Sequence, residues 1–221
     1  MSEWVEVAAG DDMSISIVEH FPNEWCGYAC ELGALDGVEQ SETLGMESIG
    51  WEVLCIEPNP DVQQRLKASR KLSLWVACGA SNQDEVSFGV CNPPASGSSF
   101  SDPEHPVRSI KAFPKYQPVK YNSVSVRTLD WCLEEVKFPR LDALVLDVEG
   151  WEPEVMAGFD VKRWNPAVLL VENWEPDTTW LAELLPSAWK FHWRREYNDI
   201  WINPERLREI HVGKVEERVR S

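Results

Sequence analysis

The sequence predicts an α/β fold: a mostly parallel sheet with helices on both of its faces. Three observations support this prediction. Short apolar segments alternate with helical patterns, a glycine-containing turn follows the first of these segments, and an acid follows the second. Near-continuous apolar strands of this kind are typical of parallel sheets that are covered on both faces. The length of 221 residues suits one such domain, with residues 1–27 as an N-terminal extension.

Five apolar segments are expected to be strands of the sheet. They are rich in Val, Leu, Ile and Cys, and they cover residues 28–32, 52–56, 74–78, 143–146 and 167–171. Near the C-terminus, two further segments follow each other closely, and we expect them to form an antiparallel pair: residues 190–195 and 199–202.

Helical patterns fill the gaps between these strands. Ser41 is expected to cap one helix, and a second is expected over residues 60–67, because proline is tolerated in the first turn. Further helices are predicted over residues 128–133 and 152–157. Two tryptophans inside these elements are expected to be core residues: Trp75 and Trp131.

One long segment, residues 91–122, does not follow this alternation. It contains six prolines and many serines, and it shows little hydrophobic periodicity. Loops of this length inside compact domains are usually functional or disordered. We interpret it as a lid or acceptor-binding loop, with a surface insertion as the alternative.

Composition excludes several classes of protein. A hydrophobic fraction of 43% and a charged fraction of 26% are typical of a globular chain rather than a disordered one. No run of about 18 apolar residues is present, so no membrane association is expected. The net charge of −16 repels the phosphates of nucleic acids, so nucleic acid is not the expected partner.

The N-terminus and the cysteines indicate a reducing compartment. The first residues are acidic and lack the basic and apolar regions of a secretory signal, so we expect a cytoplasmic protein. Of the six cysteines, Cys30, Cys55 and Cys78 fall inside apolar segments, where a free thiol behaves as a small hydrophobe. No Cys/His spacing typical of zinc is present, and we expect free thiols.

The turn after the first strand, within CELGALDGVEQSET, is the first candidate binding feature. Its glycines, Gly33 and Gly37, match neither the dinucleotide pattern G-x-G-x-x-G nor the phosphate loop G-x-x-x-x-G-K-[ST]. The acids around the turn would repel a phosphate: Glu31, Asp36, Glu39 and Glu42. The ligand expected here therefore carries positive charge or hydroxyl groups. An ordinary strand-to-helix turn is the alternative.

An acid after the second strand completes the pattern. Glu57 lies where dinucleotide-binding folds place the carboxylate that accepts the ribose hydroxyls. Its alternative role is to stabilise the N-terminus of the following helix. A cationic ligand that contains a nucleoside but no phosphate indicates S-adenosylmethionine. The turn suits its amino group and sulfonium, and Glu57 suits its ribose.

The expected cofactor-binding residues lie at the ends of four strands. Residues 78–80 would line the adenine pocket, although a plain tight turn explains them nearly as well. Two tryptophans after strand ends are candidates for stacking on adenine or a sugar: Trp151 and Trp174. The full set of expected cofactor-binding residues is Glu31, Gly33, Ala34, Asp36, Gly37, Glu57, Pro58, Cys78, Gly79, Ala80 and Asp147.

The chain resembles the FkbM-type methyltransferases, a branch of the class I S-adenosylmethionine-dependent enzymes. The resemblance spans roughly residues 28–203 and rests on ELGALDGVEQSET, GWEVLCIEPNP, VRTLDWCLEE, LDALVLDVEGWEPEVMAGFD and PAVLLVENW. It implies a Rossmann-like sheet of seven strands and methyl transfer, usually to a hydroxyl oxygen. One departure is visible at Val145, where relatives often carry Lys or Ser.

Acids at the ends of the fourth and fifth strands are the candidate reaction centre. Asp147 and Glu149 are the expected catalytic residues, either of which could act as a general base. Asp147 could instead join Glu172 and Asn173 in an oxygen-only set suited to Mg²⁺, which would lower the pKa of an acceptor hydroxyl. A third interpretation is that Glu172 and Asn173 only shape the pocket.

The function expected from these features is methyl transfer from S-adenosylmethionine to a hydroxyl of a sugar, glycan or small-molecule acceptor. Two alternatives stay open. The first is an RNA methyltransferase with the same cofactor site, and the second is a binding module that has kept the fold without catalysis. The sequence does not determine the oligomeric state.

Overall fold

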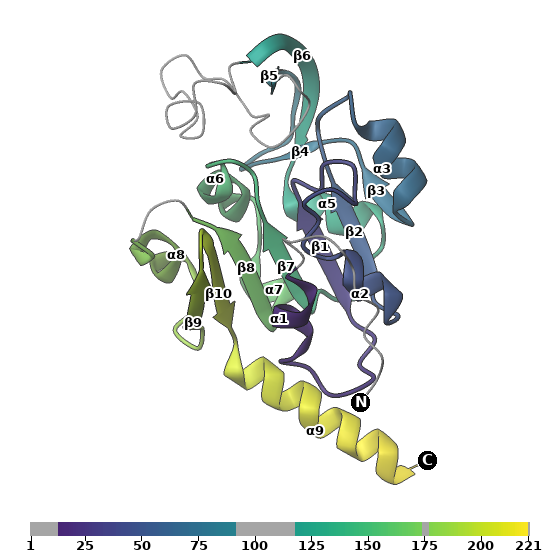
Figure 1. The fold of residues 1–221 in the computed structure, drawn as a ribbon. Helices are drawn as coiled ribbons and strands as arrows, with labels where there is room; N and C mark the ends of the chain where they lie inside the picture. The colour runs from purple at the N-terminus through teal and green to yellow at the C-terminus, as the bar shows by residue number, and fades with distance from the viewer. Residues whose placement is uncertain (1–12, 92–117, 174–176, 221) are drawn as a thin grey trace.

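A computed structural model describes residues 13–91, 118–173 and 177–220. Its main feature is a seven-stranded sheet made of β1 (Tyr28–Leu32), β2 (Glu52–Ile56), β3 (Leu72–Leu74), β7 (Ala143–Leu146), β8 (Val168–Glu172), β9 (Lys190–Arg195) and β10 (Asn198–Ile202). The strand order is β3-β2-β1-β7-β8-β10-β9 (Figure 1). The first five strands in this order are parallel, and β10 is antiparallel to both of its neighbours. The predicted fold class is confirmed, including the antiparallel pair.

Helices cover both faces of this sheet. One face carries α1 (Ser14–Val18), α2 (Leu44–Ser48), α3 (Gln63–Ser69) and α9 (Pro204–Arg220); the other carries α5 (Leu129–Glu135), α6 (Glu152–Ala157), α7 (Val161–Trp164) and α8 (Thr179–Leu184). The alternation of side chains along β1 explains the two layers, because Ala29 faces the first set while Cys30 and Leu32 face the second. Across the described ranges, no helix is both long and apolar enough to span a bilayer.

A second, smaller sheet begins where the chain leaves the first. It consists of β4 (Ala77–Cys78), β5 (Gln83–Cys91) and β6 (Pro118–Arg127), in the order β4-β6-β5 (Figure 1). The prediction of one strand over residues 74–78 is therefore wrong. The chain pairs with β2 only as far as Leu74, and it pairs with β6 from Ala77 onward.

Trp75 lies at this crossing between the two sheets. Its side chain is 41% exposed, and Lys67 Nζ lies 5.6 Å from the ring centroid. The expectation that Trp75 is a core residue is wrong, because the strand that would have buried it ends one residue earlier. Trp131, on α5, does pack against the main core and is partly buried.

The ends of the Pro/Ser-rich segment are strands rather than loop. Val90 pairs with Lys120, and Cys91 with Pro118, in the antiparallel β5–β6 ladder. Proline is tolerated at the first position of a strand, which is where Pro118 lies. The predicted loop over 91–122 is therefore wrong at Cys91 and at 118–122, and its interpretation as a lid concerns residues 92–117, outside the described ranges.

Two helices begin later in the chain than the sequence predicts. Ser41 does not cap a helix: α2 begins at Leu44, after Thr43, and no side chain caps it. The helix predicted over 60–67 runs instead from Gln63 to Ser69.

The N-terminal extension and the cysteines contribute to the core. Three side chains of the extension are buried against the face that carries α1: Met13, Ile17 and Phe21. The predicted free thiols are confirmed for five of the six cysteines: Cys26, Cys30, Cys55, Cys78 and Cys132.

Candidate active site

The turn after β1 is packed tightly against the end of β7. Gly33 has φ +85°, and a Cβ added there would lie 1.7 Å from the carbonyl oxygen of Asp147. The amide of Asp147 in turn donates to the Leu32 carbonyl at 3.1 Å. Only glycine fits this approach, since any side chain would force the two strand ends apart. Gly33 thus sets the spacing between the turn and Asp147.

The far end of the turn packs on α3. Gly37 has φ +80°, and an added Cβ would lie 2.4 Å from Cγ of Arg70. Between the glycines, Ala34 is buried, and the amides of Gly33 and Ala34 donate to the Ile56 carbonyl at 3.0 and 3.3 Å. The side-chain directions of both glycines are therefore filled by protein atoms. Their contact with a cofactor stays a prediction.

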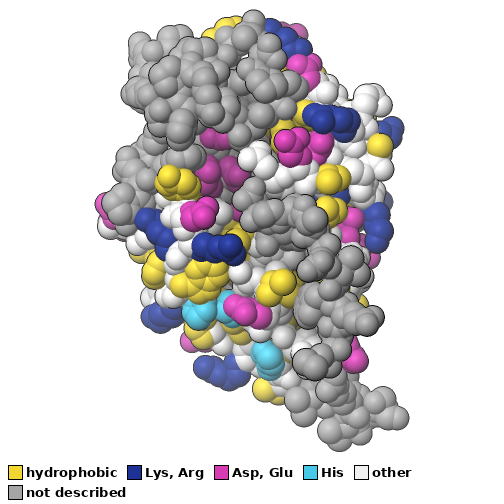
Figure 2. Space-filling model, viewed as in Figure 1, with side chains coloured by type: hydrophobic (Ala, Val, Ile, Leu, Met, Phe, Trp, Pro, Cys, Tyr) yellow, Lys and Arg dark blue, Asp and Glu magenta, His cyan; other side chains and the backbone are white. Residues whose placement is uncertain are grey.

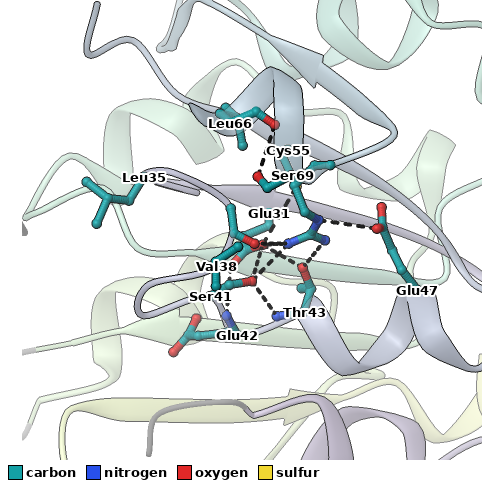
Figure 3. A network of polar contacts seen from close by, with 12 residues as sticks. Glu31, Leu35, Val38, Ser41, Glu42, Thr43, Glu47, Cys55, Leu66 and Ser69 are labelled. Atoms are coloured by element: carbon teal, nitrogen blue, oxygen red, sulfur yellow. Dashed lines mark hydrogen bonds and ion pairs between the residues drawn. The ribbon is translucent and has the colours of Figure 1, made fainter. Parts of the chain in front are cut away.

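The acids of the turn have basic partners that the sequence pattern did not reveal. Asp36 accepts hydrogen bonds from the amides of Val38 (3.0 Å) and Glu39 (2.8 Å), and it pairs with Arg65 at 3.1 Å. Glu31 is 3% exposed and lies 3.3 Å from the guanidinium of Arg70 (Figure 3). These two carboxylates are therefore partly neutralised, which weakens the argument from an acidic turn to a cationic ligand.

Glu57 lies at the end of β2 and holds the turn from the other side. Its Oε2 accepts a hydrogen bond from the Leu35 amide at 3.0 Å, and its Oε1 accepts one from the Asn59 amide at 2.8 Å. Burial raises the pKa of Glu57 to about 7, and the two amide hydrogen bonds and the nearby carboxylate of Glu149 modify this value in opposite directions. Glu57 is thus buried, desolvated and fixed beside the turn, with half-buried Pro58 next to it. Ribose binding by this carboxyl stays a prediction.

Asp147 and Glu172 form a hydrogen-bonded carboxyl pair across the ends of β7 and β8. Burial, followed by the charges of Glu172 and Glu149, raises the pKa of Asp147 well above its usual range. Two carboxyl groups at hydrogen-bond distance share a proton, because both cannot be ionised there at low cost. The structure therefore brings together Asp147, Glu149 and Glu172, three of the residues that the sequence predicts for the reaction centre.

Glu152, on the first turn of α6, is a further acid of the site that the sequence analysis did not single out. Its Oε1 accepts hydrogen bonds from the amides of Val148 at 3.2 Å and Gly150 at 3.1 Å. Burial raises the pKa of Glu152 to about 7, and the charge of Glu149 adds to this. In the sequence, its position three residues after Glu149 was the feature that could have indicated a role in the site. Figure 2 shows acidic side chains set back in a hollow in the upper part of the visible face.

The side-chain nitrogen of Asn173 is hydrogen-bonded on the side of β10. Its Nδ2 donates to Asp199 Oδ2 at 2.9 Å and to the Asp177 carbonyl at 3.2 Å, so its amide is engaged with β10 and the start of α8. Within the described ranges, no group of three or more His, Cys, Asp or Glu residues is arranged to hold a metal ion. These hydrogen bonds use Nδ2 of Asn173, and the role of its Oδ1 as a Mg²⁺ ligand beside Asp147 and Glu172 stays a prediction.

Residues 78–80 lead from the end of β4, in the smaller sheet, to Gly158 at the end of α6. Cys78 is buried with its Sγ 3.8 Å from that of Cys132, so its thiol faces the core. A Cβ added at Gly79 would lie 2.9 Å from Val126 and 3.6 Å from Nε1 of Trp151, whereas Ala80 is exposed. The amide of Gly79 donates to the Arg127 carbonyl at 3.0 Å, so of the expected adenine-pocket residues only Ala80 has an exposed side chain. Trp174 lies outside the described ranges.

A comparison with protein families gives a match that covers most of these elements. The profile described as the methyltransferase FkbM domain matches residues 31–197, from the second half of β1 to the turn before β10. The chain belongs to the FkbM methyltransferase domain family. This confirms the resemblance seen in the sequence motifs, and the family implies S-adenosylmethionine as the methyl donor.

Other comparisons add little to this assignment. A crystal structure of Methyltransferase FkbM from Methylobacillus flagellatus KT is similar, with a TM-score of 0.49 and 14% sequence identity. The match covers 80% of this chain and 43% of that one, so this chain spans less than half of that protein's length. No curated protein sequence matches the chain significantly.

The chemistry of the FkbM-domain site fits the cofactor that the family implies. Carboxyl groups dominate the strand ends, and Glu149 lies near enough to raise the pKa of three of them: Glu57, Asp147 and Glu152. Such a set favours ammonium, sulfonium and hydroxyl groups and disfavours phosphates. The residues that would hold S-adenosylmethionine are the turn from Gly33 to Gly37 and the acid Glu57.

Proposed function

We propose that this FkbM-family chain is an S-adenosylmethionine-dependent O-methyltransferase that acts on a hydroxyl of a sugar, glycan or other small-molecule acceptor. The observation that carries the proposal is the Asp147–Glu172 carboxyl pair at the ends of two central strands. Burial and the charges of Glu172 and Glu149 raise the pKa of Asp147 well above its usual range, so this carboxylate holds a proton more tightly than an ordinary one, as a general base requires.

The chain's residues have separate tasks in this proposal. S-adenosylmethionine supplies an electrophilic methyl group when it is bound. Glu57 accepts the ribose hydroxyls and so fixes the nucleoside end, while Asp147 accepts the hydroxyl hydrogen of the acceptor. Glu172, which is hydrogen-bonded to Asp147, stabilises the proton that Asp147 takes up. Glu149 is the alternative base. Alignment of the two reactants is the main source of rate, because in-line displacement depends on near-attack geometry.

The charge of the site selects the class of acceptor. Five acids lie at the strand ends or on the first turn of α6, and they would repel an anionic acceptor: Glu57, Asp147, Glu149, Glu152 and Glu172. A neutral polyhydroxyl compound suits this environment, whereas RNA does not, since its phosphates would also meet a net charge of −16. The free thiols favour a reducing compartment such as the cytoplasm.

The test is a methyl-transfer assay with isotope-labelled S-adenosylmethionine and a panel of sugars, glycosides and other hydroxyl compounds. We expect labelled product from at least one hydroxyl acceptor, and a rate lower by about 100-fold or more from the Asp147→Asn protein. Calorimetry with S-adenosylhomocysteine provides the binding control. Labelling of RNA instead of the panel would replace the proposed acceptor class. Binding of S-adenosylhomocysteine without transfer to any hydroxyl, amine or RNA acceptor would support a non-catalytic binding module.

A further inference from the structure

The side chain of Arg70, directly after α3, is fully buried and reaches into the segment between β1 and α2. Its Nη1 donates to the Gly37 carbonyl at 3.2 Å and to Ser41 Oγ at 2.9 Å. Its Nη2 donates to Thr43 Oγ1 at 2.9 Å. Figure 3 shows Ser41, Thr43 and Glu47, from the loop before α2 and from α2 itself, converging on one guanidinium. One side chain therefore joins the end of α3 to the turn and to the start of α2.

Two carboxylates form ion pairs with the guanidinium of Arg70. Glu31 Oε2 lies 3.3 Å from Nη1, and Glu47 Oε2 lies 3.5 Å from Nε. Glu31 also accepts hydrogen bonds from the Glu42 amide at 2.7 Å and from Thr43 Oγ1 at 2.5 Å. A movement that broke these contacts would leave a buried charge unpaired, which is costly. The ion pairs and hydrogen bonds therefore hold the groups in one geometry.

This network holds the glycine turn at both ends. Arg70 Nη1 donates to Glu31, two residues before Gly33, and to the carbonyl oxygen of Gly37 at the other end of the turn. The stem of Arg70 also limits the turn, since a Cβ at Gly37 would lie 2.4 Å from its Cγ. Ser69, the neighbour of Arg70, donates to the Asp36 carbonyl at 2.6 Å. The turn therefore cannot change shape without moving Arg70.

We propose that Arg70 is a positioning residue that fixes the turn from Gly33 to Gly37 in the conformation that receives the cofactor. The inference rests on the proposed function, because it assigns the turn to S-adenosylmethionine. Arg70 itself does not contact the cofactor in this proposal, since its side chain is fully buried and its Nη atoms donate to protein acceptors. It acts through Glu31 and Gly37. The sequence motif alone did not indicate this role, because Arg70 lies far from the turn along the chain.

The test compares Arg70→Lys with Arg140→Lys. Lysine keeps the charge of Arg70 but cannot donate to Gly37, Ser41 and Thr43 at the same time. We expect the Kd of S-adenosylhomocysteine, measured by calorimetry, to rise about tenfold, the effect of losing one hydrogen bond to a charged group. The KM for S-adenosylmethionine should rise while kcat at saturation stays near the wild-type value. Hydrogen exchange in the cofactor-free protein should become faster at the amides of residues 33–37.

Arg140 provides the matched control at the opposite end of β1. Its Nε donates to Asp142 Oδ2 at 2.9 Å and its Nη2 donates to the Cys26 carbonyl at 3.1 Å, so Arg140→Lys also removes a forked set of hydrogen bonds. We expect it to lower the melting temperature without changing the Kd of S-adenosylhomocysteine. An effect of Arg70→Lys on Kd and on turn exchange, beyond the effect of Arg140→Lys, supports the positioning role.

Several results would overturn the inference. If Arg70→Lys lowers the melting temperature as Arg140→Lys does but binds S-adenosylhomocysteine like the wild type, Arg70 is only structural. If Arg70→Lys does not fold, Thr43→Val removes the acceptor of Nη2 at nearly constant shape, and an unchanged Kd in that variant would be equally decisive. If the wild-type protein fails to bind S-adenosylhomocysteine, the proposed function is wrong and this inference fails with it. If the wild type binds and Arg70→Lys binds equally well, only the inference about Arg70 is wrong.

Discussion

Replacing Glu57 by glutamine tests the cofactor site most directly. Each carboxylate oxygen of Glu57 accepts one backbone amide, from Leu35 at 3.0 Å and from Asn59 at 2.8 Å. A glutamine has one oxygen acceptor, so its NH₂ group would face one of these two amide donors. We expect the free energy of unfolding to fall by about 1–3 kcal/mol at neutral pH, the cost of one buried unsatisfied donor.

The same substitution should also weaken cofactor binding, by a separate mechanism. A carboxylate that accepts ribose hydroxyls makes charge-assisted hydrogen bonds, and losing the charge should cost about 1.5–3 kcal/mol of binding free energy. This corresponds to a rise of about 10- to 100-fold in the Kd of S-adenosylhomocysteine. Calorimetry at pH 8, where the wild-type carboxyl is mostly ionised, measures this difference.

The pH dependence of binding adds a second, independent readout. With the pKa of Glu57 at about 7, the ionised fraction rises from about one-tenth at pH 6 to about nine-tenths at pH 8. The wild-type affinity for S-adenosylhomocysteine should therefore increase about tenfold over this range, and the increase should be much smaller in the Glu57→Gln protein. Glu52, exposed at the other end of the same strand, provides the control substitution Glu52→Gln.

Stability in the absence of cofactor should show the opposite trend with pH. The folded-state pKa of Glu57 lies above its unfolded value, so the folded protein binds the proton more tightly. The stability that this provides is present below about pH 4.5 and is lost as the pH rises through about 7, with an upper limit of about 3 kcal/mol. A folded Glu57→Gln protein that binds S-adenosylhomocysteine like the wild type at both pH 6 and pH 8 would refute the ribose assignment.

Three further outcomes are expected. Gly33→Ala should lower the free energy of unfolding by more than about 2 kcal/mol, because the added methyl meets the Asp147 carbonyl at a positive φ. Gly213→Ala is the control, because a Cβ added at Gly213 has open space around it. An unchanged denaturation midpoint for Gly33→Ala would contradict the packing argument. Asp147→Asn should lower turnover by about 100-fold or more while S-adenosylhomocysteine still binds, and the wild-type rate should rise with pH through the raised pKa of Asp147. A rate that does not depend on pH would exclude this base. Stripping divalent metal with a chelator should leave turnover intact, because the proposed base, Asp147, needs no metal to take up the proton. Lost turnover that Mg²⁺ restores would instead favour the metal site.

The strands could be predicted from the sequence because each is a short apolar run, a pattern that indicates a buried strand whichever strands lie beside it. Residues 28–32, 52–56 and 143–146 form strands as expected. The split near Trp75 could not be predicted, because it depends on β6, which pairs with Ala77 and Cys78 from the far side of the Pro/Ser-rich segment. Local patterns report burial, and they do not report which of two sheets provides it.

The candidate site was predictable where it follows strand ends and not where it depends on ion pairs. Asp147, Glu149 and Glu172 come together because carboxyl ends of neighbouring parallel strands meet at one edge. The partners of Asp36 and Glu31 are arginines at the outer side of α3 and at its end. These ion pairs depend on how α3 packs on the sheet, and the spacing of the acids along the turn gives no information about that packing. Counting charges near a turn therefore overstated its acidity.

The position of β1 in the sheet has a consequence for the order of folding. Ala29 pairs on one side with Val53, from the next strand in the chain, and on the other side with Ala143, from the second half. The first pairing closes a short loop, whereas the second must wait until a long stretch of chain has been synthesised and collapsed, and such long-range contacts form slowly. On the ribosome, a chain that ends before Ala143 can already contain the glycine turn, but it lacks the Asp147 carbonyl against which Gly33 packs.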